Sequence, residues 1–119
     1  MNILLNISPV LAVADILTEI EFFNKLGFSS VYDSLTYSDR LDYAVLKCED
    51  QTIHLQLFEN DLIQGQQFKI WVTEIKLVDK MLRENELILN QNYKTPWNTN
   101  EIGVYSPSKH AVIFVQELC

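Results

Sequence analysis

An internal repeat constrains the fold of this chain more than any other feature of its sequence. Residues of matching character recur at a spacing of 59: Val13 with Val72, Asp15 with Glu74, Ile16 with Ile75, Phe23 with Leu82, Val45 with Val104, Ile53 with Val112, and Leu55 with Phe114. Few of these pairs are identities, but the order of strand, cap, helix and three strands recurs without a net gap. The repeat predicts two βαβββ modules in a single domain over 1–119, the first over 1–59 and the second over 67–119.

The first half of the chain carries the patterns of a strand, a capped helix and three further strands. Residues 3–13 are apolar in the manner of a strand, and Asp15 is an N-cap candidate for a helix over 16–26. Gly27 stands where a left-handed residue commonly ends a helix. Three strands and a polar linker are then expected over 28–34, 43–47, 52–59 and 60–66.

The second half repeats these signals. A strand is expected over 68–72, Thr73 is an N-cap candidate, and the helix after it extends to about Asn85. Three strands complete the module near 87–94, 101–105 and 111–117, with the last hairpin turn over 106–109. Short strands with one helix in each half are typical of an α+β fold.

The charge of the chain argues against one class of partner and suits another. Its 119 residues carry a net charge of −7, with no run of lysine or arginine of the kind that binds a phosphate backbone. We therefore expect no nucleic-acid partner, whereas an acidic surface attracts cationic ligands or serves solubility alone. No apolar run approaches the ~20 residues that span a bilayer. The first residues lack a basic leader, so a cytoplasmic protein without a membrane partner is expected.

Recognisable catalytic motifs are missing from the sequence. Three glycines, at positions 27, 65 and 103, make no phosphate-binding loop, and no serine or cysteine stands in a glycine-flanked elbow. Cys48 and Cys119 are too few for a disulfide framework and are expected to be reduced and inert.

Three segments of the sequence are similar to one known superfamily. The opening Pro9–Asp15, followed by Phe22-Phe23 and Leu26-Gly27-Phe28, resembles the first strand and helix of the glyoxalase/bleomycin-resistance/dioxygenase, or vicinal oxygen chelate, superfamily. Residues 95–102 are similar to a Pro-Trp-Gly-x-x-Glu-Phe segment of its bleomycin-resistance proteins, and 106–109 stands in place of a final Asp-Pro-Asp-Gly turn. The resemblance covers nearly the whole chain. It implies an α+β fold in which two βαβββ modules form a curved, half-open mixed sheet around a cleft.

The sequence departs from that pattern at two turns. Asn98 replaces the glycine that follows the tryptophan, and asparagine tolerates the left-handed backbone region better than most residues. Lys109 stands where glycine would supply a positive φ at the last hairpin. We therefore expect a different type of turn there.

The resemblance also implies positions for metal ligands, which this sequence does not fill. Carried over by alignment, the four ligand positions of the metal-using relatives are Pro9, His54, Phe68 and Ile113. Only His54 has a donor side chain, and a catalytic divalent metal needs about three protein ligands. No metal cofactor is expected, therefore, and the protein is expected not to be an enzyme. A shifted alignment would bring in Glu101, Gln56 or Glu117, but a one-residue slip turns a strand side chain to the other face.

Aromatic and acidic side chains of the sheet are the candidates for a ligand site. Trp97 leads them, because the equivalent tryptophan of the resembling family stacks on the drug; covering the edge of the barrel is its alternative role. His54 would donate to a ligand or be satisfied within the core, while His110 is expected on the surface. The candidate ligand-binding residues are Trp97, His54, Trp71, Phe58, Phe68, Tyr43, Asp33 and Glu101, with Glu59 and Asp61 as further acidic candidates. Any one of the acidic residues could equally be a solvated surface charge.

These expectations combine into a non-catalytic binding protein. The resemblance implies sequestration of an aromatic ligand or antibiotic, which can also be cationic, in a groove at the interface of a homodimer. It further implies dimerisation by exchange of the N-terminal strand, here residues 3–13. Two alternatives from other classes stay open: a metal-dependent lyase or dioxygenase of the glyoxalase type, and a structural or regulatory module that has lost its pocket.

Overall fold

The chain divides into two compact units, Met1–Ile63 and Gln64–Cys119. The computed structural model describes residues 3, 5–58, 65–87 and 91–118. The boundary between the units lies within the linker expected over 60–66, of which only Gly65 and Gln66 are among the described residues. Each unit has a sheet and a helix of its own.

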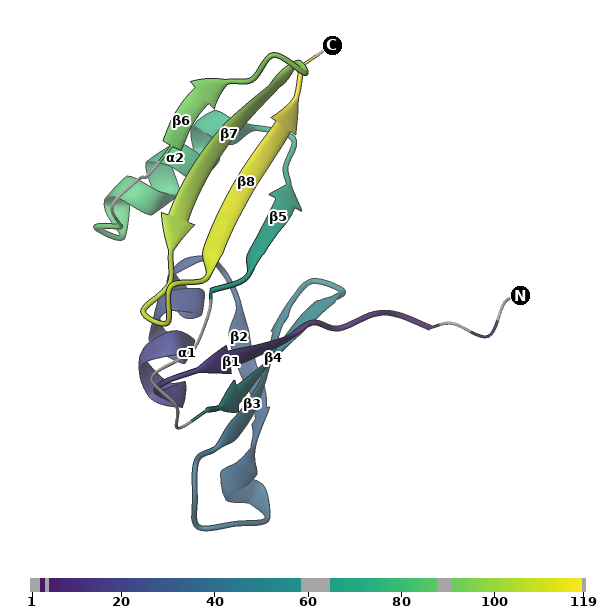
Figure 1. The fold of residues 1–119 in the computed structure, drawn as a ribbon, viewed down its shortest axis with the longest axis vertical. Helices are drawn as coiled ribbons and strands as arrows, with labels where there is room; N and C mark the ends of the chain where they lie inside the picture. Colours follow the sequence, from purple (N-terminus) through teal and green to yellow (C-terminus); the bar gives the residue numbers. More distant parts are fainter. Residues whose placement is uncertain (1–2, 4, 59–64, 88–90, 119) are drawn as a thin grey trace. The chain divides into compact units, whose positions relative to one another are not determined.

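The first unit is a four-stranded mixed sheet with one helix. Its elements are β1 (Val10–Val13), α1 (Ile16–Lys25), β2 (Ser29–Asp33), the 3-10 turn η1 (Ser34–Thr36), β3 (Tyr43–Cys48) and β4 (Gln51–Leu57). The strand order is β1-β4-β3-β2 (Figure 1). The first strand therefore pairs in parallel with the last, and the other neighbours are antiparallel.

The second unit repeats this arrangement. Its elements are β5 (Gln67–Trp71), α2 (Ile75–Glu84), β6 (Gln91–Lys94), β7 (Thr99–Tyr105) and β8 (Ala111–Glu117). The strand order is β5-β8-β7-β6, again with the first strand parallel to the last and antiparallel pairs elsewhere (Figure 1). The α+β fold of two βαβββ modules is thus confirmed.

Helix α1 begins and ends as the sequence predicts. The Asp15 carboxylate accepts a hydrogen bond from the backbone N–H of Thr18 at 3.1 Å, which satisfies one of the free donors of the first turn. Gly27, with φ of 100°, follows the C-cap Leu26. Because a residue with a Cβ is strained at that φ, glycine suits this helix end.

Helix α2 is capped differently from the prediction. The N-cap position belongs to Glu74 and not to Thr73, and the Glu74 side chain makes no capping hydrogen bond. Instead the side-chain oxygen of Gln116, on β8, accepts from the backbone N–H of Ile75 at 2.8 Å. A cap that comes from a distant strand has no local signal in the sequence.

In the described ranges, no helix has the length and apolar character needed to cross a membrane.

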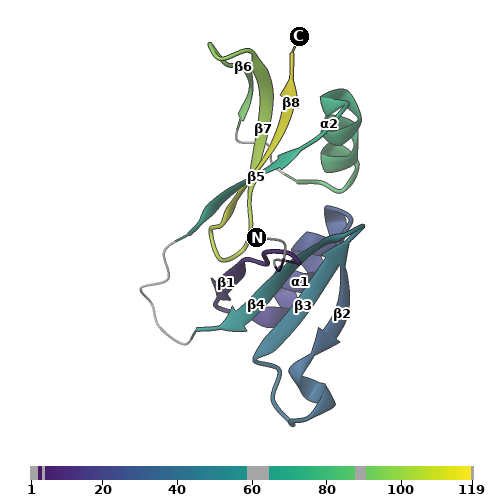
Figure 2. The ribbon, with the colours of Figure 1, turned by 90° about the vertical axis from the view of Figure 1, so that its right-hand side faces the viewer.

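Each sheet buries one face against the helix of its own unit. In the first unit, strand alternation puts Leu11, Leu46 and Leu55 on one face; all three are buried, as is Phe23 of α1. The equivalent core residues of the second unit are Ile102, Val104, Val112, Phe114 and, on α2, Leu82. Figure 2 shows each helix along one side of its own sheet. We call the other side of each sheet its far face.

The strand register corrects the repeat at one position. His54 of β4 pairs with Val45 of β3, and Ile113, the equivalent of His54 on β8, pairs with Gly103 of β7. Val45 therefore corresponds to Gly103 and not to Val104. The pairing partner, rather than the count of residues, decides which side chains share a face.

The strand expected over 3–13 is shorter than predicted. β1 begins at Val10, and the described residues before it have no regular secondary structure. Ile3, Leu5 and Ile7 are 75, 97 and 87 % exposed. Within the first unit the segment extends away from the sheet as a tail (Figure 1). Pro9 has no N–H to donate to a neighbouring strand, which favours the end of pairing at this point.

The last hairpin buries a histidine that we expected on the surface. His110 is 0 % exposed, and its Nδ1 accepts a hydrogen bond from the backbone N–H of Gln66 at 2.9 Å. The N–H of Ala111 donates to the carbonyl of Gln66 at 2.8 Å. The chain just before β5 therefore packs on the turn before β8, a long-range contact that no local pattern indicates.

Among the described residues, four other than glycine adopt left-handed backbone conformations. They are Glu49, Glu86, Asn98 and Lys109, with φ of 52, 60, 70 and 69°. The expectation for Asn98 is confirmed. We expected the last turn to avoid a positive φ at Lys109, but this lysine adopts it, with its N–H donating to the carbonyl of Ser106 at 2.8 Å.

Gly65→Ala is expected to lower the free energy of unfolding by about 1–3 kcal/mol, the usual range for overpacking. A Cβ on Gly65 would lie 1.9 Å from the carbonyl oxygen of Lys109, so the backbone of one segment must shift. Denaturant unfolding measures the change, with Gln66→Ala at the exposed neighbouring position as the matched control. Equal stability of the two variants would show that this close approach does not exist in solution.

Candidate functional site

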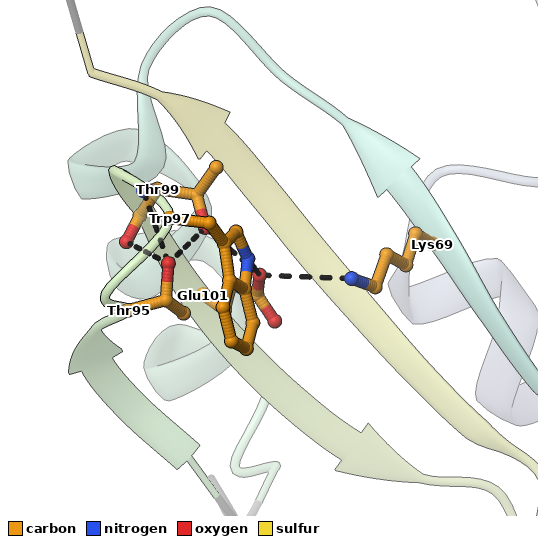
Figure 3. A network of polar contacts seen from close by, with 5 residues as sticks. All are labelled: Lys69, Thr95, Trp97, Thr99 and Glu101. Atoms are coloured by element: carbon orange, nitrogen blue, oxygen red, sulfur yellow. Dashed lines mark hydrogen bonds and ion pairs between the residues drawn. The ribbon is translucent and has the colours of Figure 1, made fainter.

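Three parts of the second unit meet on the far face of its sheet. Strand alternation and register place Lys69 of β5 and Glu101 of β7 on this face, on either side of β8. Trp97 lies in the turn between β6 and β7. Figure 3 shows its indole beside the Glu101 carboxylate, with the Lys69 side chain reaching toward them from β5. We call these residues, with Thr95 and Thr99, the Glu101 site.

The turn that carries Trp97 is closed by its own backbone and by the end of the chain. The N–H of Asn98 donates to the carbonyl of Thr95 at 3.2 Å, and the N–H of Thr95 donates to the carbonyl of Thr99 at 2.8 Å. The Asn98 side chain donates to the carbonyl of Leu118. The left-handed Asn98 thereby reverses the chain directly after Trp97, which sets the indole over the start of β7.

Glu101 is a buried carboxylate with two hydrogen-bond donors and one cation at the same oxygen. Its residue is 3 % exposed. Oε2 accepts from the Thr99 hydroxyl at 2.9 Å and from the Trp97 indole N–H at 3.2 Å. The Lys69 ammonium lies 3.7 Å from the same oxygen. A buried carboxylate needs such compensation because it has lost most of its water.

The hydroxyl groups of Thr95 and Thr99 form a hydrogen-bonded chain that ends at the Glu101 carboxylate. Because a carboxylate accepts, the Thr99 hydroxyl must donate to Glu101 and can then accept from the Thr95 hydroxyl, 2.7 Å away. Thr95 in turn accepts from the backbone N–H of Thr99 at 3.1 Å. Thr95 and Thr99 are 3 and 4 % exposed, so this relay is shielded from water and its members reinforce one another.

Lys69 is held less firmly than the other members of the site. Its ammonium lies 5.9 Å from the centroid of the Trp97 ring, within the range of a cation–π contact. Its side chain is 40 % exposed, compared with 4 % for Glu101. The site thus combines a fixed carboxylate, an anchored indole and a half-exposed cation.

A second, separate cluster lies on the first unit. Val45 and His54 share the far face of that sheet, and the Tyr43 hydroxyl lies 2.5 Å from Nδ1 of His54. Next to this pair is a surface hollow of about 420 Å³ lined by Tyr37, Arg40, Asp42, Tyr43, Gln56, Leu57 and Phe58. The buried Ser34 hydroxyl orders the loop beside it by donating to the carbonyl of Arg40 and accepting from the N–H of Asp42.

The eight candidate ligand residues therefore separate by position. Tyr43, His54 and Phe58 belong to the cluster on the first unit, and Trp97 and Glu101 belong to the Glu101 site on the second unit. Trp71, 63 % exposed, is on the far face of β5, two residues beyond Lys69. Whether these residues bind a ligand stays a prediction.

Two of the candidates have other places in the fold. Asp33 accepts from the backbone N–H of Leu35 at 2.9 Å and caps η1. Phe68 pairs with Val112, so it shares the helix-covered face and not the far face. Glu59 and Asp61 lie outside the described residues.

Sequence reasoning missed Lys69, Thr95 and Thr99. Two signals could have indicated them. Lys69 alternates with Trp71 on one strand, and Thr99 alternates with Glu101 on another, so each pair shares a face. No local sequence pattern indicates that β5 and β7 both pair with β8, which is what brings the two pairs together.

The donor set does not fit the metal site that the resembling family uses. Val10 pairs with His54, and Lys69 with Ile113, so the far-face positions of β1 and β5 are one residue beyond Pro9 and Phe68. With that correction the set still offers a single imidazole, since a protonated lysine only donates. Within the described ranges, no three His, Cys, Asp or Glu side chains gather in a group that could hold a metal ion.

The architecture defines the class of protein to which this chain is similar. Neither a family model nor a curated protein matches the sequence. Solved structures do match: a bleomycin-binding protein in complex with bleomycin superposes with a TM-score of 0.77 at 11 % identity, over 94 % of this chain and 98 % of that one. The chain therefore has the glyoxalase/bleomycin-resistance fold.

Other proteins of known structure share the architecture. A bleomycin resistance determinant encoded on a transposon gives a TM-score of 0.78 at 11 % identity, covering 94 % of this chain and 97 % of its own. The lactoylglutathione lyase from Agrobacterium tumefaciens gives 0.75 at 14 % identity, with 93 % and 92 % covered. These likenesses confirm, for the fold, the resemblance seen in the sequence.

The Lys69–Glu101 pair is expected to contribute a coupling free energy of about 1 kcal/mol, limited by the exposure of Lys69. A double-mutant cycle with Lys69→Met and Glu101→Gln, measured by denaturant unfolding, gives this value. The control cycle is Lys80→Met with Glu84→Gln, an ion pair on α2 with a similar N–O distance of 3.8 Å but 73 and 63 % exposed side chains. Coupling no larger than in the control would contradict the shielding of the site.

Proposed function

We propose that the protein binds a small aromatic ligand without chemical turnover, as its resemblance to bleomycin-resistance proteins implies. One observation carries the proposal: Trp97 is 61 % exposed, yet its indole N–H is fixed to the buried Glu101. An exposed indole that is held in place offers a flat apolar surface at a small entropic cost, which is what a stacking ligand requires. The bleomycin-binding protein of the same fold, solved with its drug, supports this assignment.

The proposal extends to sequestration of an antibiotic in the cytoplasm. Tight binding lowers the free concentration of a drug by mass action, and no reaction is needed. The free thiol of Cys48 is compatible with a reducing compartment. Trp71, which lies on the same far face of the second unit and is exposed, would add an aromatic contact.

The enzyme alternative is favoured by the likeness to a lactoylglutathione lyase. A glyoxalase-type reaction needs a metal held by about three protein side chains. The corrected positions Val10, His54, Lys69 and Ile113 do not supply them. The other alternative, a structural module without a ligand, explains the hydrogen bond from Trp97 to the buried carboxylate but not why the indole stays 61 % exposed.

We also propose that the protein is a homodimer joined through its N-terminal segment. Ile3, Leu5 and Ile7 alternate with other residues at the period of a β-strand and are nearly fully exposed. An apolar strand without a partner tends to pair with another chain. Addition of this segment to a second copy would extend β1 beyond Val10 and bury the three side chains.

Metal-free bleomycin is expected to bind with micromolar or tighter affinity and to quench tryptophan fluorescence. Calorimetry gives the affinity independently of the tryptophans. Trp97→Ala is expected to weaken binding at least about tenfold, a loss of ~1.4 kcal/mol that is typical of one aromatic stacking contact. Leu77→Ala, at an equally exposed position on α2, is the matched control and is expected to bind as the parent does. Absence of heat at high drug concentration, or unchanged binding by Trp97→Ala, would count against the proposal.

A variant with Leu5→Asp and Ile7→Asp is expected to be monomeric at micromolar concentration, where the parent is dimeric. Two carboxylates on one face of the segment would be buried without partners in the paired strand. Light scattering measures the mass, with Asn6→Asp as a control that adds charge at an alternate position. A monomeric parent, or a dimeric double variant, would contradict this mode of association.

A further inference from the structure

The Lys69 ammonium lies beside Trp97 and Glu101, in the position that the cation of a ligand would take. It lies 3.7 Å from Oε2 of Glu101 and 5.9 Å from the centroid of the Trp97 ring. A carboxylate and an indole face are two groups that attract cations directly. The chain therefore supplies a cation of its own to this site.

The contacts of Lys69 are long, whereas the other contacts of Glu101 are short. Thr99 and Trp97 donate to Oε2 at 2.9 and 3.2 Å. The 3.7 Å separation from Lys69 exceeds a hydrogen-bond distance, and 5.9 Å is close to the ~6 Å limit of a cation–π contact. The lysine side chain, 40 % exposed, also keeps part of its water and its rotamer freedom. The carboxylate is thus fixed, and its cation can be exchanged.

The second carboxylate oxygen of Glu101, Oε1, indicates which kind of cation would replace the Lys69 ammonium. Both hydrogen-bond donors and the Lys69 ammonium are at Oε2, and the hydrogen bonds of the described residues include none to Oε1. An ammonium acts as a point charge, whereas an amidinium or guanidinium is planar and donates to both oxygens of a carboxylate. Its flat face also stacks on an indole. A planar cation therefore uses both Oε1 and the exposed face of Trp97.

We propose that Lys69 is a displaceable internal cation, and that the Glu101 site selects ligands whose planar amidinium or guanidinium group replaces it. This inference rests on the proposed binding function and adds the ligand class and the residue that sets selectivity. When such a group binds, the Lys69 ammonium moves into water and the charge of Glu101 stays compensated. A neutral ligand leaves the pair intact, so its affinity does not depend on Lys69.

The test uses Trp71→Phe as the parent, in which Trp97 is the single tryptophan. Benzamidine and its neutral analogue benzamide are titrated while Trp97 fluorescence is followed. Lys69→Met is expected to tighten benzamidine binding roughly fivefold, the factor expected from removing a competitor held by a partly exposed ion pair, and to leave benzamide unchanged. Glu101→Gln is expected to abolish the preference for benzamidine over benzamide.

Lys76→Met is the matched control, since Lys76 is an exposed residue of α2 outside the site and its loss changes the net charge equally. Circular dichroism checks each fold, and Lys69→Gln replaces Lys69→Met if the latter does not fold. Weaker or unchanged benzamidine binding by the Lys69 variants, or equal tightening of both probes, would overturn the inference while the binding function stands. If bleomycin and both probes leave the fluorescence of Trp97 unchanged, the proposed function fails, and the inference fails with it.

Discussion

The parallel pairing of the first strand of each unit with its last strand is the constraint on which the structure depends. In the first unit β1 pairs with β4, and in the second β5 pairs with β8. This pairing completes the four-stranded sheet of each unit, and its register determines which side chains face the helix and which lie on the far face. A shift by one residue would turn Lys69 toward α2 and Phe68 toward Glu101, and the charged cluster would not exist. The strand register therefore decides which side chains meet on the far face, and only then do their identities determine the chemistry.

The Glu101 site shows how a buried carboxylate is compensated in a small fold. Its carboxylate is compensated by a hydroxyl relay from Thr95 and Thr99, by the Trp97 indole and by Lys69. The first two belong to one short turn and need no distant element. The third depends on β5. The ion pair between Lys69 and Glu101 therefore forms only when β5 is paired with β8. Thr95 and Thr99 of the local relay are buried, whereas the distant partner, Lys69, has a side chain that is 40 % exposed.

The fold could be predicted because its signals are local and occur twice. Asp15 and Gly27 mark the ends of α1, and the apolar spacing of the two helices gives both modules. The expectations that failed involve long-range contacts: the Gln116 cap on α2, the burial of His110 against Gln66, and the short β1. Of the site, Trp97 was a candidate from the resemblance and Glu101 was a candidate as one of several acidic side chains. Lys69 was missed because its relation to Glu101 passes through β8 and has no sequence spacing of its own.

The backbone also shows how this chain manages with three glycines. Gly27 takes one left-handed position, and Glu49, Glu86, Asn98 and Lys109 hold four others at chain reversals. Left-handed conformations cost roughly 1 kcal/mol for residues with a Cβ, least for asparagine. Glu49, Glu86 and Lys109 lie in turns other than the one that carries Trp97. Glycine at those three positions would remove the cost, so the turns hold stability that the present sequence does not use.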